Sequence, residues 1–254
     1  MKGGQALRII ICGACGRIGK ELTALCDKGF RSCTCAAKVD LTGGDDCFGS
    51  LSEYRGNADV IIDFSSHSAV NELLFEAEKR SLPVVIATTG HTKAEQEIID
   101  RASLEIPIFQ SCNMSIGMAH IIRMIFELTK FYPDADIEII ETHHSRKTDV
   151  PSGTALLLAN EIIKNKKGSY AVVGRSRSQR RSKNEIGIHS VRLGNCAGTH
   201  EVIFSSGYET ITLKHEALSP ILFAMGAIEA AEFILRQAPG LYGMKNISEE
   251  YYEG

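Results

Sequence analysis

The segment LRIIICGACGRIG, residues 7–19, places an apolar run directly before three glycines. The run LRIIIC is typical of a buried strand, and Gly13, Gly16 and Gly19 follow it at even spacing. Apolar residues then recur with helical periodicity, so the sequence predicts a strand, a tight turn and a helix. Glycines in such a turn let the backbone approach a pyrophosphate, which N–H groups at the helix N-terminus bind. We therefore predict a dinucleotide site here, although G-x-x-G-x-x-G differs from the usual G-x-G-x-x-G.

Two charged residues at the end of the next strand bear on the choice of dinucleotide. The segment CTCAAKVD, residues 33–40, is the predicted second strand and ends at Asp40. An acid about 20 residues after the glycine turn can hold a ribose hydroxyl, whereas Lys38 would favour a 2′-phosphate. An ordinary loop acid is the alternative interpretation of Asp40. The sequence leaves the choice between NADH and NADPH open.

Strands and helices alternate through the first half of the chain, which predicts βαβ units and a mostly parallel sheet. The predicted strands of this half are 7–12, 33–40, 58–64, 82–89 and 106–112. Thr92 and Glu95 are expected to form a capping box at the start of one of the helices. The second half changes character and predicts an antiparallel or mixed sheet. Its predicted strands are 136–143, 188–194, 199–206 and 210–215.

The composition excludes several classes of protein. The chain has 254 residues, 44% of them apolar, and a net charge of −3, so it can build one large or two modest domains and has no basic excess for nucleic acid. The longest apolar segment, residues 218–235, contains Pro220, Glu229 and Glu232, and we interpret it as a packed helix rather than a membrane span. The apolar run near the N-terminus is too short for a signal peptide. We expect a cytoplasmic protein without nucleic-acid or membrane partners.

The cysteines are expected to be free thiols in a reducing compartment. Six of the eight lie before residue 50, so they do not pace the chain as a disulfide framework would. Cys12 and Cys15 form a C-x-x-C inside the glycine turn, but no second C-x-x-C supplies partners for zinc.

A basic segment, GRSRSQRRSKNE, spans residues 174–185. Its cations are Arg175, Arg177, Arg180, Arg181 and Lys183. We interpret it as a mobile solvated loop. The alternative is a basic flap that helps to hold an anionic ligand.

The segment ETHHSRKTDVPSGTA, residues 141–155, concentrates titratable side chains. Adjacent histidines on an extended segment point to opposite sides, and no H-E-x-x-H is present, so we expect no metal. A solvated loop explains the charges but not the Pro-Ser-Gly-Thr sequence that follows them. There Ser152 can cap a helix, and the first N–H groups of that helix, at Gly153 and Thr154, can bind an anion. Two histidines and Lys147 stand just before this anion site. The arrangement suits a small carboxylate substrate and proton transfer to it.

The same segment resembles the signature E-x-H-H-x-x-K-x-D-x-P-S-G-T-A of the dihydrodipicolinate reductase family. The glycine turn is similar to the family's cofactor loop, G-x-x-G-R-[MI]-G. Further similar blocks follow in the family's order: VIIDFSS (60–66), ATTG (87–90), SCNMSIG (111–117), EIGIHSVRLGN (185–195) and GLYGM (240–244). The resemblance covers nearly the whole chain. It implies reduction of 4-hydroxy-tetrahydrodipicolinate (dihydrodipicolinate) to tetrahydrodipicolinate by NADH or NADPH, in lysine and diaminopimelate biosynthesis.

The resemblance also implies roles for particular residues. His143 is expected to be the catalytic acid, and Lys147 a second proton donor that also stabilises charge. The residues expected to hold substrate carboxylate are His144, Lys147, Gly153 and Thr154. Those expected at the adenosine end of the cofactor are Gly13, Gly16, Arg17, Ile18 and Asp40. Those expected at the nicotinamide are Ala87, Thr88, Thr89, Ser111, Cys112, Asn113 and Met114.

The implied fold class is α/β, with two domains. Residues 1–115 and 223–254 are expected to form a Rossmann-type dinucleotide-binding domain. Residues 116–222 are expected to form an α+β domain with a mixed sheet, which binds substrate and assembles the homotetramer that is usual in the family. The chain departs from the family pattern at Ala87, which replaces the glycine of G-T-T-G, at Pro220, where arginine is common, and at Leu193, which replaces a small residue.

Two other functions are compatible with part of the sequence. Another small dehydrogenase, such as an aspartate-type one, would share the glycine turn but has no reason to contain H-H-x-x-K followed by P-S-G-T. A nicotinamide-binding sensor without catalysis could lose His143 and Lys147, and both are present.

Overall fold

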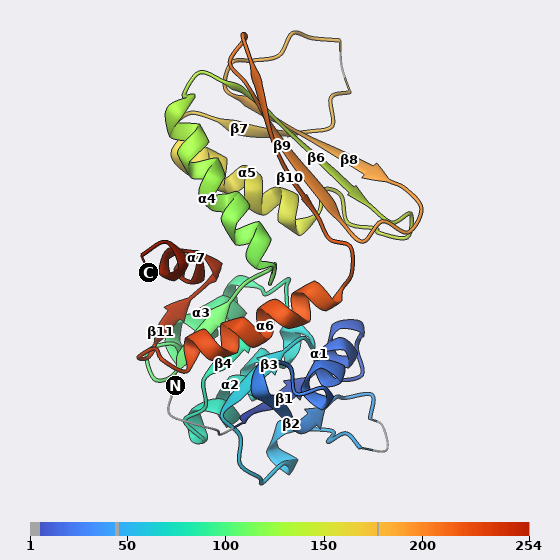
Figure 1. The fold of residues 1–254 in the computed structure, drawn as a ribbon, viewed down its shortest axis with the longest axis vertical. Coiled ribbons are helices and arrows are strands. Elements are labelled where there is room, and N and C mark those ends of the chain that lie inside the picture. Colours follow the sequence, from blue (N-terminus) through green and yellow to red (C-terminus); the bar gives the residue numbers. More distant parts are fainter. Residues whose placement is uncertain (1–5, 44–45, 177, 254) are drawn as a thin grey trace. The chain divides into compact units, whose positions relative to one another are not determined.

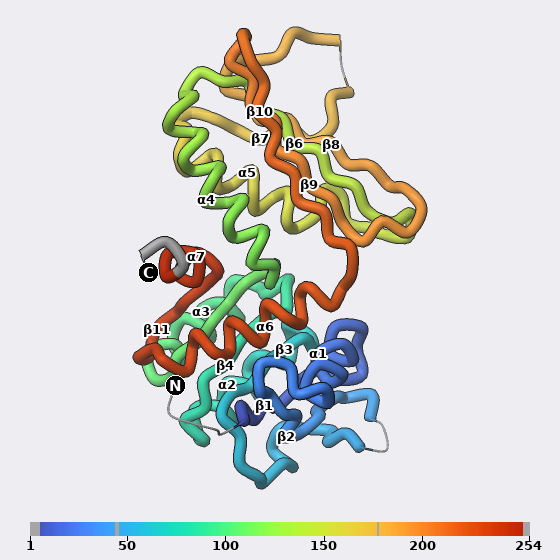
Figure 2. The backbone as a smooth tube through the Cα atoms, in the orientation of Figure 1, coloured from blue at the N-terminus to red at the C-terminus, as the bar shows by residue number. Residues whose placement is uncertain are grey.

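The computed structural model describes residues 6–43, 46–176 and 178–253. The chain divides into two compact units, one of Met1–Ile116 with Pro220–Gly254 and one of Gly117–Ser219. The tube in Figure 2 shows the C-terminal segment, drawn in red, returning to the elements built by the blue-to-green part of the chain. The first unit is therefore assembled from both ends of the chain.

The first unit contains a six-stranded sheet in which every neighbouring pair is parallel (Figure 1). Its strands are β1 (Leu7–Cys12), β2 (Cys33–Val39), β3 (Val60–Asp63), β4 (Val84–Ile86), β5 (Pro107–Gln110) and β11 (Gly240–Tyr242). Their order is β11-β5-β4-β3-β1-β2, so the chain runs outward from β1 to β2 and then returns across β1 to β3. The carboxyl ends of β1 and β3 form the topological switch point, where open α/β sheets bind their ligands.

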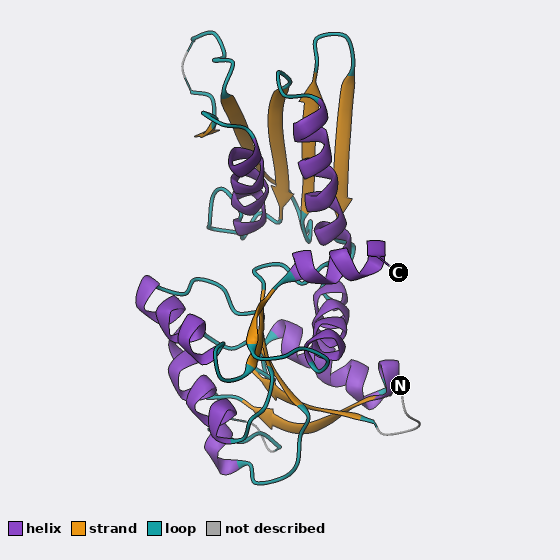
Figure 3. Cartoon of the chain, turned by 90° about the vertical axis from the view of Figure 1, so that its left-hand side faces the viewer, coloured by secondary structure: helices purple, strands orange, loops and turns teal. Residues whose placement is uncertain are grey.

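Helices cover both faces of this sheet (Figure 3). They are α1 (Arg17–Asp27), α2 (Val70–Lys79), α3 (Lys93–Ala102) and α6 (Ile221–Ile234). Helix α7 (Met244–Glu253) contacts α6, and three short 3₁₀ turns complete the unit: η1 (Phe30–Ser32), η2 (Leu51–Glu53) and η3 (His67–Ala69). Helix α1 packs against α6, and α2 against α3. Because both faces are covered, β3 and β4 are buried at every residue, which explains why their sequences are apolar except for Asp63 at the end of β3. The expected capping box is confirmed, because Thr92 accepts from the backbone of Glu95 and the Glu95 side chain accepts in return.

Helix α6 packs directly on the loop that follows β5. A Cβ atom at Gly226 would overlap the backbone carbonyl of Met114, so only glycine allows this approach. Gly226 and Met114 are both buried, as is most of the helix. The C-terminal apolar segment is thus a packed helix, as interpreted from the sequence. Among the residues that the structure describes, no helix has the length and apolar character to cross a membrane.

The second unit is a five-stranded mixed sheet with two helices on one face (Figure 3). Its strands are β6 (Asp136–His143), β7 (Tyr170–Val173), β8 (Glu185–Arg192), β9 (Thr199–Ser205) and β10 (Thr210–Glu216). The central strand β6 pairs antiparallel with β9 and parallel with β8. Of the two sheets predicted for the second half, antiparallel or mixed, the mixed sheet is therefore confirmed. Helices α4 (Ile116–Phe131) and α5 (Gly153–Asn165) share one apolar core with the sheet. The predicted α/β class, with a parallel Rossmann-like sheet and a second mixed sheet, is therefore confirmed.

The basic segment 174–185 is held against this sheet by ion pairs. Arg181 contacts Asp136 at 2.5 Å and Glu138 at 3.0 Å. Arg175 contacts Glu185 at 2.5 Å. These two guanidinium groups already have carboxylate partners, which argues against the anion-holding flap. Residues 174–176, 178–180 and 182–184 are exposed, in agreement with a solvated segment. Arg177 lies outside the described residues.

Candidate active site

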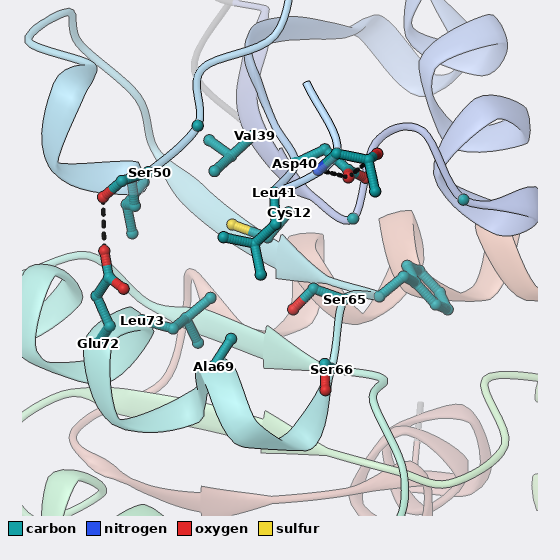
Figure 4. A pocket seen from close by; sticks show the side chains of 16 residues that line it. Cys12, Val39, Asp40, Leu41, Ser50, Ser65, Ser66, Ala69, Glu72 and Leu73 are labelled. Atoms are coloured by element: carbon teal, nitrogen blue, oxygen red, sulfur yellow. Dashed lines mark hydrogen bonds between the residues drawn. The ribbon is translucent and has the colours of Figure 1, made fainter. Parts of the chain in front are cut away.

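A cavity of about 290 Å³ opens at the carboxyl ends of β1, β2 and β3 (Figure 4). Three loops line it, around Gly13 after β1, Asp40 after β2 and Ser65 after β3. Side chains of Leu51 and Leu73 add apolar wall. The cavity therefore lies at the switch point of the sheet, and its size and apolar walls suit a nucleoside.

The glycine turn is fixed by close backbone contacts. Gly13 has a φ of +77°, and a Cβ atom there would lie 2.5 Å from the carbonyl oxygen of Phe64. A Cβ atom at Gly19 would overlap the carbonyl of Gly13, so α1 also begins in contact with the turn. Glycine is required at both positions, which gives the unusual spacing a structural reason. Gly16 lines the cavity, whereas Arg17 and Ile18 begin α1 next to it.

Asp40 is held by the glycine turn and by its own loop. Its Oδ2 accepts from the backbone N–H of Cys15 at 2.9 Å, and its Oδ1 accepts from the N–H and hydroxyl of Thr42. Burial alone would raise the pKa of Asp40, but the hydrogen bonds from Thr42 and Cys15 outweigh it and lower that pKa. A carboxylate has about four acceptor sites, so one remains for a ribose hydroxyl. Lys38 instead contacts Asp46 at 3.8 Å and is not among the residues that line the cavity.

A second hollow, of about 330 Å³, lies between the loops that follow β3 and β4. It is lined by the predicted residues Ala87, Thr88 and Thr89. The buried Asp63 joins the two loops, because it accepts from the hydroxyl of Ser65 at 2.5 Å and from that of Thr88 at 2.7 Å. Sequence reasoning missed Asp63, although a carboxylate inside the apolar run VIIDF was a visible signal.

The predicted segment Ser111–Met114 follows β5 and lies beside the end of β4. The backbone N–H of Ser111 donates to the carbonyl of Ile86 at 3.1 Å. Asn113 and Met114 are buried, whereas Cys112 is exposed. These residues line neither the first cavity nor the second hollow.

In the second unit, His143 ends β6 with its ring against a buried carboxylate. Its Nδ1 lies 2.5 Å from Oε2 of Glu141, two residues earlier on the same face of the strand. Arg192, opposite His143 on β8, donates to both oxygens of Glu141 at 2.9 Å. Burial raises the pKa of Glu141, but the hydrogen bonds from Arg192, Ser190 and His143 outweigh it and lower that pKa to about 2. For His143, burial lowers the pKa and outweighs the opposite effect of Glu141.

The start of α5 is tied to the same carboxylate. Ser152 caps the helix, because its hydroxyl accepts from the N–H of Ala155 at 3.2 Å, and its own N–H donates to Glu141 at 3.2 Å. The hydroxyl of Ser152 also lies 3.0 Å from Nε2 of His200, whose ring stacks edge-on against His143 at 5.2 Å. The predicted cap is confirmed. Gly153 and Thr154 are the first residues of the helix, where its dipole favours an anion.

The other two predicted residues lie on the loop between β6 and α5. Nζ of Lys147 contacts Asp149 at 2.8 Å, and the Lys147 side chain is 20% exposed. Nδ1 of His144 is buried and has no hydrogen-bond partner among the described residues. Among those residues, no group of three or more histidine, cysteine, aspartate or glutamate side chains is placed to hold a metal ion.

Gly198 faces the free side of the His143 ring. A Cβ atom at this position would lie 3.1 Å from Nε2 of His143, and the φ of +154° disfavours any side chain. Sequence reasoning missed Gly198, Arg192 and His200, because each approaches His143 from strands or loops some 50 residues away along the chain. It also missed Glu141, although the spacing of Glu141 and His143 on a predicted strand was the available signal.

A switch-point cavity behind a glycine turn and a buried histidine–carboxylate pair are features of dinucleotide-binding oxidoreductases. Two family models identify the family within this class of protein. The model described as dihydrodipicolinate reductase, N-terminus, matches residues 7–114, and the one described as dihydrodipicolinate reductase, C-terminus, matches residues 117–247. The chain therefore belongs to the dihydrodipicolinate reductase family and is an oxidoreductase. These matches confirm the resemblance seen in its sequence.

Individual relatives agree with this assignment. A protein of Caldanaerobacter subterraneus subsp. tengcongensis named 4-hydroxy-tetrahydrodipicolinate reductase is 42% identical over 95% of this chain and 98% of its own length. One of Clostridium tetani with the same name is 41% identical over 94% of this chain and 95% of its own. The fold is similar to that of dipicolinate-bound dihydrodipicolinate reductase from Paenisporosarcina sp. TG-14, with a TM-score of 0.80, 23% identity, and coverage of 96% of this chain and 100% of that one.

Replacement of Gly198 by alanine tests whether Nε2 of His143 must stay accessible. The added methyl group is expected to press on Nε2 and lower kcat by about 10²-fold, the typical cost of misplacing a reacting group. Binding of reduced nicotinamide dinucleotide, measured by fluorescence titration, is expected to stay unchanged, because that cavity belongs to the first unit. Unchanged kcat in a folded Gly198→Ala protein would show that substrate does not approach Nε2.

Proposed function

We propose that the chain converts 4-hydroxy-tetrahydrodipicolinate to tetrahydrodipicolinate with NADH or NADPH, in the lysine and diaminopimelate pathway. The substrate loses its 4-hydroxyl group as water to give dihydrodipicolinate, which takes up one hydride and one proton. The single observation that carries the proposal is the His143–Glu141 pair set next to the capped start of α5. It brings a proton donor and a carboxylate-binding helix end together. The names of the relatives supply the substrate, and a bound dipicolinate in the Paenisporosarcina structure is a ring dicarboxylate of the same kind.

The proposal divides the work between the domains expected from the sequence. Residues 1–115 and 223–254 would bind the dinucleotide, and residues 116–222 would bind the substrate. The adenosine end of the dinucleotide would lie in the first cavity, because Gly13 brings the backbone close and Asp40 keeps an acceptor site for a ribose. Gly16, Arg17 and Ile18 would hold the pyrophosphate at the start of α1.

The nicotinamide end of the dinucleotide would lie against the loops that follow β3, β4 and β5. The residues proposed there are Ala87, Thr88, Thr89, Ser111, Cys112, Asn113 and Met114. Asp63 would keep the loops after β3 and β4 in place through Ser65 and Thr88. The bound nicotinamide supplies the hydride.

The residues of the second unit would handle charge and protons. His143 would donate a proton from Nε2 to the ring as negative charge builds on the conjugated nitrogen. Lys147 would stabilise that charge and serve as a second donor. His144, Gly153 and Thr154, with Lys147, would hold substrate carboxylate, using the positive end of α5.

We further propose that NADH is the better coenzyme. The ionised Asp40 lines the adenosine cavity, and Lys38 is engaged with Asp46 instead. A 2′-phosphate would meet Asp40 as a like charge, and such a juxtaposition costs several kcal/mol.

The coenzyme proposal is tested by comparing kcat/KM for NADH and NADPH. The wild-type protein is expected to favour NADH, and Asp40→Asn to improve NADPH relative to NADH by about tenfold or more, since about 1.4 kcal/mol is tenfold. Asp100→Asn, on the exposed side of α3, is the matched control and is expected to leave the ratio unchanged. A wild-type preference for NADPH that Asp40→Asn does not increase would exclude this role of Asp40.

The proposed assembly is a cytoplasmic homotetramer. The face of the second sheet that points away from α4 and α5 carries Ile140, Val191 and Ile203, none of them buried, which a partner chain would cover. Free cysteines are consistent with a reducing compartment. Light scattering that returned the mass of a single chain would refute the assembly.

The reaction itself is tested with His143→Ala and Lys147→Ala. Dihydrodipicolinate synthase supplies the substrate from pyruvate and aspartate semialdehyde, and loss of reduced nicotinamide absorbance is followed. Each variant is expected to lose about 10²–10⁴-fold in kcat, the usual contribution of a positioned proton donor, while binding NADH normally. Lys164→Ala, which removes an exposed lysine of α5, is the control and is expected to keep full activity. Near-normal turnover in a site variant would remove that residue from the mechanism, and no turnover by the wild type would refute the function.

A further inference from the structure

The Glu141 carboxylate is fully buried, and all its acceptor sites are in use. Oε1 accepts from the N–H of Ser152 at 3.2 Å and from Arg192 at 2.9 Å. Oε2 accepts from Arg192 at 2.9 Å and lies 2.5 Å from Nδ1 of His143. A carboxylate offers about four acceptor sites and has no hydrogen to donate. The contact with His143 is therefore a hydrogen bond that Nδ1 donates.

The hydrogen bond to Glu141 also determines which ring nitrogen of His143 carries the hydrogen. When His143 is neutral, its single ring hydrogen must stay on Nδ1, and Nε2 is left as the nitrogen that exchanges protons. Nε2 is also the ring atom nearest Gly198, where a Cβ atom would lie only 3.1 Å away, so the lack of a side chain keeps Nε2 uncovered on that side. The orientation of the proton donor is thus determined by a group that does not itself face the substrate side.

We propose that Glu141 is the positioning residue of this active site: one buried carboxylate holds His143 with Nε2 toward the substrate and, through the N–H of Ser152, fixes the anion-binding start of α5. The proposal rests on the proposed function, since it assigns a role in the same reaction. It goes beyond that function because it links proton donor and carboxylate site through one residue. Glu141 acts through its neighbours and touches neither substrate nor cofactor.

The charges around His143 make the role of Glu141 measurable. Glu141 is the anion in direct contact with the ring. Facing the ring from other elements are Arg192 of β8 and Lys147 of the next loop, both cations, the latter paired with Asp149. His200 of β9 is the remaining neighbour, and burial lowers its pKa to about 4, so it is neutral at pH 7. Without the charge of Glu141, burial and two cations all oppose protonation of His143.

The test is the dependence of kcat on pH for Glu141→Gln, with synthase-generated substrate and saturating NADH. Glutamine keeps the size and one acceptor oxygen but removes the charge. A proton donor works only below its pKa, so kcat should fall on the alkaline side of the profile. An opposite charge within about 4–6 Å shifts a pKa by about 1–3 units, so the alkaline limb of Glu141→Gln is expected to move about one unit or more toward lower pH. KM should change less than kcat at the pH optimum.

Two further variants distinguish a positioning role of Glu141 from a nonspecific loss of structure. Glu141→Asp restores the charge at a shorter reach, and is expected to return the alkaline limb to its wild-type position while kcat stays reduced. Glu161→Gln, on α5 and paired with Lys164, is the matched control and should reproduce the wild-type profile. Circular dichroism of each variant shows whether it folds.

The outcomes are distinct. A folded Glu141→Gln protein whose kcat falls equally at every pH would overturn the proposal and leave Glu141 a structural residue. If Glu141→Gln does not fold, Glu141→Asp decides, because a limb shifted toward lower pH despite the retained charge would overturn it. Failure of the wild-type protein to oxidise NADH with this substrate would refute the proposed function instead, before any variant is compared.

Discussion

The second unit depends on one buried charge that is completely satisfied by hydrogen bonds. An isolated carboxylate inside a protein costs several kcal/mol, so Glu141 is tolerated only with Arg192, His143 and Ser152 around it. Arg192 supplies the opposite charge, and its place opposite His143 follows from the parallel register of β6 and β8. The mixed sheet therefore builds this network, because it brings together residues that are 51 positions apart along the chain.

The first unit positions its cavity by a different constraint. There the carboxyl ends of three parallel strands meet, and the loops after them come into direct backbone contact. Gly13 is wedged against Phe64, and α1 begins against Gly13, so the absence of side chains shapes the site. Asp63 and Asp40 then tie neighbouring loops together with short side-chain hydrogen bonds. One unit is organised by backbone contact and the other by a buried ion network.

The sequence predicted what local patterns encode. Strands β1 to β5 of the parallel sheet, the capping box at Thr92 and the cap at Ser152 follow from periodicity and short-range chemistry, and the structure has them. Strands β7 and β11 were not predicted, because a few residues give no periodic signal and their pairing partners lie far away in the chain. Glu141 was quoted within the motif but passed over, since its role depends on Arg192, which only the strand register brings near. The close approach of Gly198 to His143 is likewise a fact of three-dimensional packing.

In the proposed role, Glu141 dictates which nitrogen of His143 exchanges protons. The most direct measurement is nitrogen NMR of the ¹⁵N-histidine-labelled wild-type protein, at a pH where His143 is neutral, with His143→Ala used to assign its signals. We expect the ring hydrogen on Nδ1 and the signature of an unprotonated nitrogen at Nε2. A hydrogen found on Nε2 in the neutral ring would contradict this role, because Glu141 would then not be accepting from His143.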